Sequence, residues 1–362
     1  MLNRFSSRTP VTIAQVARAA GVSKATVSLV LNGQQARGRI SAATRESVSE
    51  WALRLGYVPN QAARSLRRRR SNAITLLVWR LSSTYFTEIA YGVRSAAEQA
   101  GYEVQVVDAG PVDAEVRALR QLRTGASDGV IVATGYHTTR GPAVRALRDL
   151  ARQGAPLVML LDHPPDPRVP AIRIDDEGGA YIATRHLLTL GHRRIGHISV
   201  NGGRLDEDDE SPQYDRFAGF TKALEEAGVR VDRRAIVQGP GLMAGGRASA
   251  LKLLGRFRSS TTRPTALFVY NDLAAIGVLR ALYELGIRVP DDIAIVGFHG
   301  LELGQFTTPS LTTIAHPLSE LGEMGAQRLL RMIQEPDHAA EAEETVLPVE
   351  LVVRESCGGA SG

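Results

Sequence analysis

Basic side chains are concentrated at the start of this chain. Residues 1–71 hold 13 arginine and lysine residues but only two acidic ones, Glu46 and Glu50, so the segment carries a net charge of 13 − 2 = +11. The remaining residues hold 43 − 13 = 30 basic and 38 − 2 = 36 acidic side chains, a net charge of −6. A small basic unit on a mildly acidic body is typical of a protein that binds a polyanion. Charge alone does not distinguish DNA from RNA or an acidic membrane.

Residues 12–32, TIAQVARAAGVSKATVSLVLN, predict two short helices joined by a tight turn. Thr12 and Gln15 have the spacing of a capping box, and apolar residues then recur at helical spacing. Gly21 stands where a helix end needs a residue that tolerates positive φ, and Ser23 suits the N-cap of the second helix. This is the pattern of a helix-turn-helix, whose second helix enters the DNA major groove. An ordinary helical hairpin has the same local pattern, and the next forty residues favour the DNA-binding interpretation.

A third helix and a very basic segment follow this pair. Ser41 can cap the third helix, which ends at Gly56. The apolar stripe of this helix consists of Val48, Trp51, Ala52 and Leu55. Pro59 then opens a short helical segment, QAARSLRRRR, which has too few apolar residues to form a core. We expect it to order only against DNA, a second copy of itself, or both.

No set of residues has the spacing of a catalytic or metal site. His186, His192 and His197 lack carboxylate or cysteine partners at metal-ligand spacing, and Gly245-Gly246 lacks the pattern of a phosphate-binding loop. Cys357 is the only cysteine, so we expect an inert thiol in a Gly/Ser-rich tail, without a disulfide or a cysteine-based metal site. The sequence therefore predicts no catalytic residue, no metal and no cofactor.

Length and composition describe an ordinary globular protein of more than one domain. The chain has 362 residues, of which 44% are hydrophobic, enough for two or three domains with sizeable cores. No apolar run reaches the ~18 residues that a membrane span requires, and the first residues lack the apolar stretch of a secretion signal. We expect a cytoplasmic protein without a membrane partner.

From Ile74 onward, apolar strand-like runs alternate with helical stretches. The expected strands are ITLLVW, EVQVVDA, GVIVA, PLVMLLD, AIRID, RIGHISV, AIVQG, TALFVYN and IAIVGF. The expected helices lie at residues 86–100, 114–124, up to 154, 180–190, 216–227, 246–257 and 272–285. Such alternation predicts parallel sheets with helices on both faces. Because there are too many units for one sheet of this size, we expect two similar α/β lobes.

Together these segments resemble the lactose-repressor/galactose-repressor (LacI/GalR) family of bacterial transcription regulators over essentially the whole chain. The most specific matches are VTIAQVARAAGVSKATVSLVLNG, RISAATRESVSEWALRLGYVPNQAARSL, HLLTLGHRRIGHI, DRFAGF, FVYNDLAAIG, DIAIVGF and PSLTTI. The resemblance implies an all-α helix-turn-helix head, a hinge helix and an α/β sensor core of two Rossmann-like lobes, similar to type I periplasmic binding proteins. It also implies a homodimer.

In that family the chain crosses between the lobes three times, which places the crossings here near Arg173, Ala315 and Glu344. The expected head is residues 1–57 and the expected hinge or linker is residues 58–72. The first lobe would then comprise residues 73–173 and 315–343, and the second lobe residues 174–314 and 344–362.

The resemblance also assigns DNA contacts. Lys24, Ala25 and Leu29 match the positions that read bases: the lysine can donate to guanine, and the other two can touch a thymine methyl group. Contacts to the DNA backbone, which position the protein without specifying sequence, are implied for Thr12, Ser23, Thr26, Ser28, Asn32, Ser41, Arg45 and Asn60. Thr12 and Ser23 can serve as helix caps as well.

Tyr57, Asn60, Ala63 and Leu66 match the family's hinge. In the family a hinge leucine from each protomer wedges into the minor groove at the operator centre, and such wedges kink the duplex. Leu66 is the expected wedge, with Ala63 beside it on the hinge helix. Packing between two hinge helices is the alternative role for Leu66.

The family's effector lies between the lobes, at the ends of the strands. The matching positions are Trp79, Phe86, Asp162, Arg216, Asn271, Asp272 and His299. Two departures, His299-Gly300 where the family commonly has Asp-Asp and WRLSSTYF after the first strand, argue against a plain sugar and leave a different or phosphorylated molecule open. For Trp79 and Phe86, ordinary core packing is the alternative.

The sequence thus predicts a ligand-responsive transcriptional repressor, cytoplasmic and nucleoid-associated. As a homodimer it would bind a pseudo-palindromic double-stranded DNA operator, under control of a sugar-like or related small molecule. The chain ends ESCGGASG, without the leucine heptads that would make a tetramer. Two alternatives remain: a DNA-binding regulator with a degenerate sensor, and a solute-binding protein or enzyme that shares the α/β core.

Overall fold

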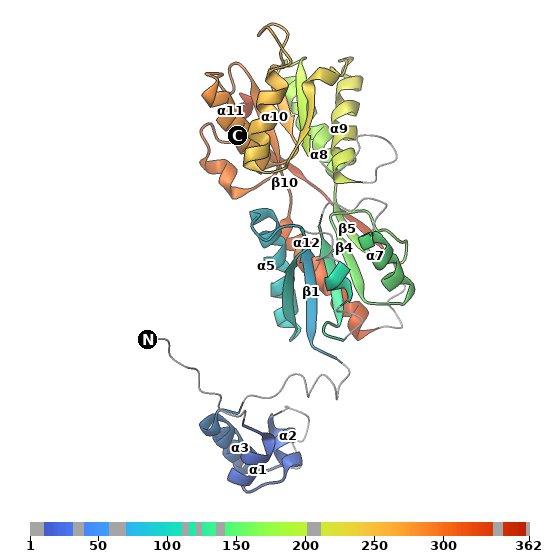
Figure 1. The fold of residues 1–362 in the computed structure, drawn as a ribbon, viewed down its shortest axis with the longest axis vertical. Helices are drawn as coiled ribbons and strands as arrows, with labels where there is room; N and C mark the ends of the chain where they lie inside the picture. Colours follow the sequence, from blue (N-terminus) through green and yellow to red (C-terminus); the bar gives the residue numbers. More distant parts are fainter. Residues whose placement is uncertain are drawn as a thin grey trace. The chain divides into compact units, whose positions relative to one another are not determined.

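The computed structural model describes residues 11–31, 40–57, 70–110, 116–120, 125–134, 142–200, 211–335 and 343–359. The chain divides into two compact units, Met1–Ser71 and Asn72–Gly362, and each is described by itself (Figure 1). Within these described ranges, no helix has both the length and the apolar character that crossing a membrane requires.

The first unit is a three-helix domain. Its helices are α1 (Ile13–Ala19), α2 (Lys24–Leu31) and α3 (Ala42–Leu55), and each contacts the other two. Their shared core consists of Val16, Ala17, Val27, Val48 and Ala52. These are apolar residues at helical spacing, as the sequence predicts.

Short-range hydrogen bonds fix the ends of these helices. Gly21 has φ +68°, which turns the chain after α1, and the Val22 N–H donates to the Ala17 carbonyl over 3.0 Å. The Ser23 hydroxyl accepts from the Thr26 N–H at the start of α2 over 3.0 Å. Gly56, with φ +67°, ends α3. The sequence predictions for both turns are confirmed.

The second unit contains two six-stranded sheets, each covered by helices on both faces (Figure 1). The sheet of the first lobe has the order β11-β5-β4-β3-β1-β2 and is parallel throughout. Its strands are β1 (Ala73–Val78), β2 (Glu103–Asp108), β3 (Gly129–Ala133), β4 (Leu157–Leu160), β5 (Ala171–Ile174) and β11 (Glu344–Leu347). The helices of this lobe include α5 (Thr84–Gln99), α7 (Pro142–Arg152) and α12 (Leu318–Gln334).

The sheet of the second lobe has the order β12-β10-β9-β8-β6-β7, and only β12 is antiparallel to its neighbour. Its strands are β6 (Ile195–Val200), β7 (Ile236–Gly239), β8 (Ala266–Val269), β9 (Ala294–His299), β10 (Thr312–Ala315) and β12 (Glu350–Val352). The α-helices are α8 (Asp176–Thr189), α9 (Pro212–Glu226), α10 (Met243–Leu254) and α11 (Asp272–Glu284), and the 3₁₀ turns are η1 (Arg233–Ala235), η2 (Glu302–Phe306) and η4 (Glu355–Cys357).

The last crossing between the lobes differs from the prediction. β11 pairs in parallel with β5, with Glu344 opposite Ala171, so residues 344–347 belong to the sheet of the first lobe. The crossing therefore follows Leu347, and the predicted position near Glu344 is wrong. β11 is a short edge strand with alternating exposure rather than a buried apolar run, which explains why its sequence, ETVL, gave no strand signal.

Cys357 is also placed differently from the prediction. It is 1% exposed, its Sγ lies 3.2 Å from His186 Nε2, and the Thr312 hydroxyl donates to Sγ over 3.1 Å. The neighbouring Ser356 hydroxyl donates to the Ile295 carbonyl over 2.7 Å. These hydroxyl contacts seat η4 against β9 and β10, so Cys357 is a core residue of the second lobe and not a thiol in a tail.

Candidate DNA-reading surface and effector site

The second helix of the head presents three predicted base-reading residues to solvent. Lys24, Ala25 and Leu29 are exposed, whereas Val27 on the opposite side of α2 is buried in the core. An ammonium group beside two small apolar groups offers a donor for guanine and contacts for thymine methyl groups. α2 therefore has the exposed face that a recognition helix needs.

Hydroxyl side chains stand at the start of all three helices. Thr12 donates to the Gln15 side chain through its N–H over 2.8 Å and its hydroxyl over 3.0 Å, and the Ser41 hydroxyl accepts from the Thr44 N–H over 3.2 Å. With Ser23, these caps are exposed, whereas Thr26, Ser28 and Arg45 are half-buried. The predicted contact residues Asn32, Asn60, Ala63 and Leu66 lie outside the described residues.

In the second unit, Arg216 of α9 is at the centre of a buried polar cluster. Its Nε donates to Asp176 Oδ1 over 2.7 Å, and its Nη1 donates to the Tyr270 carbonyl over 2.7 Å and lies 3.2 Å from His299 Nε2. The guanidinium carbon lies 4.0 Å from the ring centre of Phe298 and 4.2 Å from that of Tyr270. Arg216 is thus fixed by a carboxylate, a carbonyl and two aromatic faces.

The close contact of two helices positions this arginine. A Cβ atom added at Gly219, one turn after Arg216 on α9, would lie 2.1 Å from the Glu177 carbonyl oxygen of α8. Only glycine permits the two helices to approach so closely. This approach brings Asp176 at the start of α8 against Arg216.

The two charges of this pair stay ionised near neutral pH. Burial raises the pKa of Asp176 to about 6, although Arg216 acts against this rise. Burial lowers the pKa of Arg216, but Asp176 together with Tyr270 and Tyr85 outweighs burial and leaves that pKa above the usual value. The ion pair therefore has little net charge, and the carboxylate is engaged with the protein's own arginine.

Aromatic rings from both lobes meet beside Arg216. Tyr85 of α5, in the first lobe, stacks on His299 at the end of β9, in the second, with ring centres 3.9 Å apart. The ring of His316 lies 5.3 Å from His299 and 5.9 Å from Tyr85. We call Tyr85, Asp176, Arg216, His299 and His316 the interlobe cluster.

Both histidines of this cluster are neutral. Burial, followed by the charge of Arg216, lowers the pKa of His299 and of His316 well below the ordinary value. Both ring nitrogens of His316 are buried and have no hydrogen-bond partner among the described residues. Such an imidazole can donate one hydrogen bond and accept another, so a polar ligand here would satisfy it.

Asn271 and Asp272, two predicted effector contacts, are engaged with the protein. Asn271 caps α11 by accepting from the Ala274 N–H over 2.7 Å, and its amide donates to the Gly241 carbonyl over 3.0 Å. Asp272 accepts from the Thr313 hydroxyl and from the Leu301 N–H, each over 2.7 Å. These contacts hold α11, β10 and the segment after β9 together.

Three further predicted contacts lie in the first lobe. Phe86 is buried in the hydrophobic core of that lobe, and Trp79 packs against the same core. Asp162 is buried and accepts from the Thr134 hydroxyl over 3.4 Å. Of the predicted effector residues, the structure brings Arg216 and His299 into direct contact.

Sequence reasoning missed Tyr85, Asp176 and His316. Tyr85 lies in the WRLSSTYF stretch, whose departure from the family pattern was a signal, and His316 follows the PSLTTI motif at a lobe crossing. Polar contacts also join the lobes, because His163 Nε2 lies 3.2 Å from Asp215 Oδ2 and Arg173 lies 3.8 Å from the same oxygen.

Comparisons with known proteins agree with a helix-turn-helix head followed by an α/β core. The family model "Bacterial regulatory proteins, lacI family" matches residues 12–60, and the model "Periplasmic binding protein-like domain" matches residues 184–357. The HTH-type transcriptional regulator DegA of Bacillus subtilis is 36% identical over 348 residues, which cover 95% of this chain and 97% of the relative. The HTH-type transcriptional repressor PurR of Photobacterium profundum is 31% identical, covering 95% and 98%.

Solved structures give the same result. The lac repressor dimer bound to operator and the anti-inducer ONPF has a TM-score of 0.80 at 30% identity, covering 96% of this chain and 99% of that one. The complex of the transcriptional regulator CelR with cellobiose has a TM-score of 0.70 at 29% identity, with the same coverage. Because these relatives are transcription regulators and not enzymes, and because the match extends over both units, the chain belongs to the lacI family of bacterial regulatory proteins.

Proposed function

We propose that this protein is a homodimeric repressor of transcription that binds a pseudo-palindromic DNA operator. The observation that carries the proposal is the exposure of Lys24, Ala25 and Leu29 together on the second helix of the helix-turn-helix. A single such helix reads only a few base pairs, so two heads on two half-sites give the specificity that a repressor needs. In the sequence, Leu66 supplies the apolar wedge for the minor groove between the half-sites.

Exposed apolar side chains on the second unit support a homodimer. Tyr91 of α5, Tyr283 of α11 and Phe306 of η2 are 68%, 77% and 76% exposed, and Met243 is half exposed beside α11. Aromatic side chains and methionine are enriched at protein interfaces relative to the rest of the surface, so these residues are candidates for the dimer contact. A two-fold dimer matches the symmetry of a palindromic operator.

The interlobe cluster is the proposed effector site. A buried arginine with two neutral histidines and a tyrosine suits a small polar metabolite with hydrogen-bond acceptors and a ring face that stacks on an aromatic side chain. The carboxylate of Asp176 is already bound to Arg216, which leaves a sugar without the acidic partner that its hydroxyls favour. Sugar phosphates and nucleosides are therefore the first classes to test, with plain sugars as the comparison.

The proposed response is a change in the relative orientation of the lobes. A ligand in the cluster touches Tyr85 from one lobe and Arg216 from the other, so it binds one orientation better than another. A difference of about 1–3 kcal/mol changes operator affinity about 5–150-fold. The sign of the response, induction or corepression, follows from which orientation binds DNA.

One observation favours a second candidate, a DNA-binding regulator that needs no effector. Tyr85 and His299 are each more than nine-tenths buried, and the ring of one covers the ring of the other. In this alternative the protein's own tyrosine occupies the site and fixes one orientation of the lobes.

Genomic pull-down with the purified protein tests both candidates. The wild-type chain should recover one palindromic DNA motif, and the Lys24→Ala/Leu29→Ala variant should lose it. Leu53→Ala is the matched control, because Leu53 is 84% exposed on α3 and is not among the predicted DNA contacts. A compound that changes retention of the motif identifies the effector, and retention unaffected by all three classes favours the second candidate. Failure to recover any motif, even at low salt, where phosphate contacts are strongest, contradicts the proposal.

A further inference from the structure

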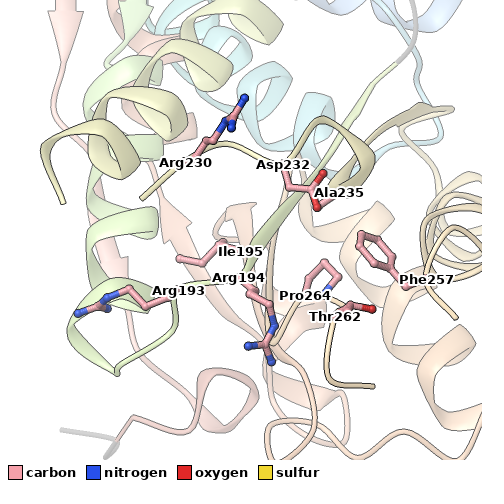
Figure 2. A pocket seen from close by; sticks show the side chains of 9 residues that line it. All are labelled: Arg193, Arg194, Ile195, Arg230, Asp232, Ala235, Phe257, Thr262 and Pro264. Carbon is pink, nitrogen blue, oxygen red and sulfur yellow. The ribbon is translucent and has the colours of Figure 1, made fainter. Parts of the chain in front are cut away.

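A small cavity lies at the edge of the second-lobe sheet where its parallel strands begin. It has a volume of about 70 Å³ and lies beside the starts of β6 and β8. Its lining includes Ile195, Ala235, Pro264, Phe257 and Thr262 (Figure 2). The interlobe cluster lies at the other ends of these strands, so the cavity is a separate place on the lobe.

Arginines surround this cavity. Arg193, Arg194 and Arg230 line it, and in Figure 2 their side chains leave the wall in three different directions. All three are exposed, as are three more arginines that flank the lining residues Asp232 and Phe257 in the sequence. We call these six residues the arginine rim: Arg193, Arg194, Arg230, Arg233, Arg256 and Arg258.

The charge of the rim is not compensated by nearby carboxylates. Asp232, which also lines the cavity, forms its ion pair with Arg234, at 2.8 Å. In the described part of the chain, no ion pair within 4.0 Å joins a rim arginine to an acidic side chain. The rim is therefore a strongly positive area on a body whose net charge is negative.

Backbone carbonyls hold several of these guanidinium groups in place. Arg194 donates to the Arg263 carbonyl over 2.9 Å, and Arg193 donates to the Leu188 carbonyl over 2.9 Å. Arg256 donates to the Ile236 carbonyl over 2.9 Å. A carbonyl fixes an arginine without cancelling its charge, so the remaining N–H groups stay available to an anion at a lower entropic cost.

The dimensions of the cavity limit what can bind. Pockets for small metabolites typically measure about 300–1,000 Å³, so this one is too small for a metabolite. Guanidinium groups that point in different directions do not converge on a single oxyanion either. A small pocket to which Ile195, Ala235 and Pro264 contribute apolar groups, surrounded by a wide charged rim, instead has the form of an interface that receives one anchoring side chain of a partner.

We infer that the arginine rim and its cavity bind an acidic segment of a partner protein, in which one aliphatic side chain enters the cavity and flanking carboxylates meet the arginines. Arginine pairs with carboxylates in a bidentate geometry, and opposite charges speed the encounter. The aliphatic groups of Ile195, Ala235 and Pro264 within the cavity favour a protein segment over a nucleic acid, which offers phosphates but no aliphatic anchor. This inference does not rest on the proposed operator or effector.

Fluorescence anisotropy with full-length protein and a labelled peptide tests the inference. The peptide carries one leucine between two runs of aspartate and glutamate, and a second peptide has serine in place of leucine. Wild-type protein should bind the leucine peptide more tightly, and both affinities should fall as salt rises. Arg193→Glu/Arg194→Glu should weaken binding by about tenfold or more, the order expected from two reversed charge contacts.

Two controls separate the rim from general charge and from folding. Arg185→Glu/Arg331→Glu makes the same change in net charge at exposed sites outside the rim, and it should keep wild-type affinity. Thr262→Trp, at the exposed border of the cavity, should remove the preference for leucine while leaving the melting temperature unchanged. Equal loss in both double variants assigns the binding to the overall charge of the protein and overturns the inference. It is overturned equally if the leucine peptide does not bind, or if the rim variant binds it as tightly as wild type does.

Discussion

The ring of Tyr85 in the first lobe lies 3.9 Å from the ring of His299 in the second, with an angle of 23° between the planes. Tyr85 also forms an edge contact with Phe86 at 5.1 Å. The first lobe therefore reaches the second through a ring that is itself fixed in the core of its own lobe. A substitution at Tyr85 or His299 should therefore change both the stability of the second unit and the orientation of its lobes.

Tyr85→Ala should destabilise the second unit by about 3–5 kcal/mol, the usual cost of removing a large buried ring. Tyr85→Phe keeps the stacked ring and should cost much less. Urea denaturation followed by circular dichroism measures both. Equal stability of Tyr85→Ala and wild type would mean that the stacked pair does not join the lobes in solution.

Asp176→Asn should cost about 3–5 kcal/mol, because it leaves Arg216 buried without its counter-charge. The double variant Asp176→Asn/Arg216→Met removes both charges and should recover much of the loss. Glu177→Gln is the control: its ion pair with Lys222 is exposed, and its loss should change stability by less than about 1 kcal/mol. A loss in the double variant as large as in Asp176→Asn would contradict this account of the pair.

Asp272 should make stability depend on pH. Burial raises its pKa from 3.8 to about 7, against hydrogen bonds from Thr313 and Leu301. At pH values between these two pKa values, Asp272 is protonated in the folded protein but ionised in the unfolded chain. Its contribution to stability therefore falls as pH rises from about 4 to 7. Melting temperatures of Asp272→Asn should decline less steeply over this range than those of wild type; parallel curves would contradict the prediction.

His163 should make stability depend on pH in a different pH range. Its hydrogen bond with Asp215 raises its pKa above the ordinary value of 6.5, although burial and Arg173 act against this rise. The stabilisation is complete below pH 6.5 and is lost as pH rises through the higher folded value. Melting curves of wild type and His163→Gln should therefore differ most at acid pH and converge on the alkaline side. A constant difference at all pH values would exclude a titrating bridge.

DNA binding offers a test within the head. Lys24→Ala should cost about 1–3 kcal/mol on the preferred operator and relax the base preference at one position, as expected for a base-reading lysine. Arg45→Ala should instead weaken binding to all sequences and reduce its salt dependence. Titrations of operator and scrambled DNA at several salt concentrations distinguish the two. A uniform loss for Lys24→Ala would reassign that residue to the DNA backbone.

Local sequence patterns were sufficient for most elements of the fold. The run ITLLVW, residues 74–79, predicts a strand because its residues are apolar or β-branched. In the structure β1 occupies residues 73–78, and all six are buried. Helix starts were less accurate: α8 begins at Asp176, four residues before the expected 180, because the Asp175 side chain accepts from the Gly178 N–H over 2.8 Å and caps it. α12 was not among the expected helices, although its buried stripe follows helical spacing.

The site could be predicted only in part, since its contacts join distant segments. Arg216 and His299 were found by resemblance, but the partner of Arg216 lies 40 residues away and depends on the approach of α8 and α9. The contact of Tyr85 with His299 depends on how two lobes meet, which no local pattern encodes. The same limit applies to Asp272, a residue with the expected chemistry whose oxygens bind the protein itself.

The pairing of β11 with β5 and of β12 with β10 has a consequence for biosynthesis. Each sheet receives a strand from residues 344–352, so neither lobe can be completed until the ribosome has made that segment. The head needs only residues 11–57 for its core and can fold while the rest is being made. In the cell, the part that recognises DNA is therefore ready before the part that would control it.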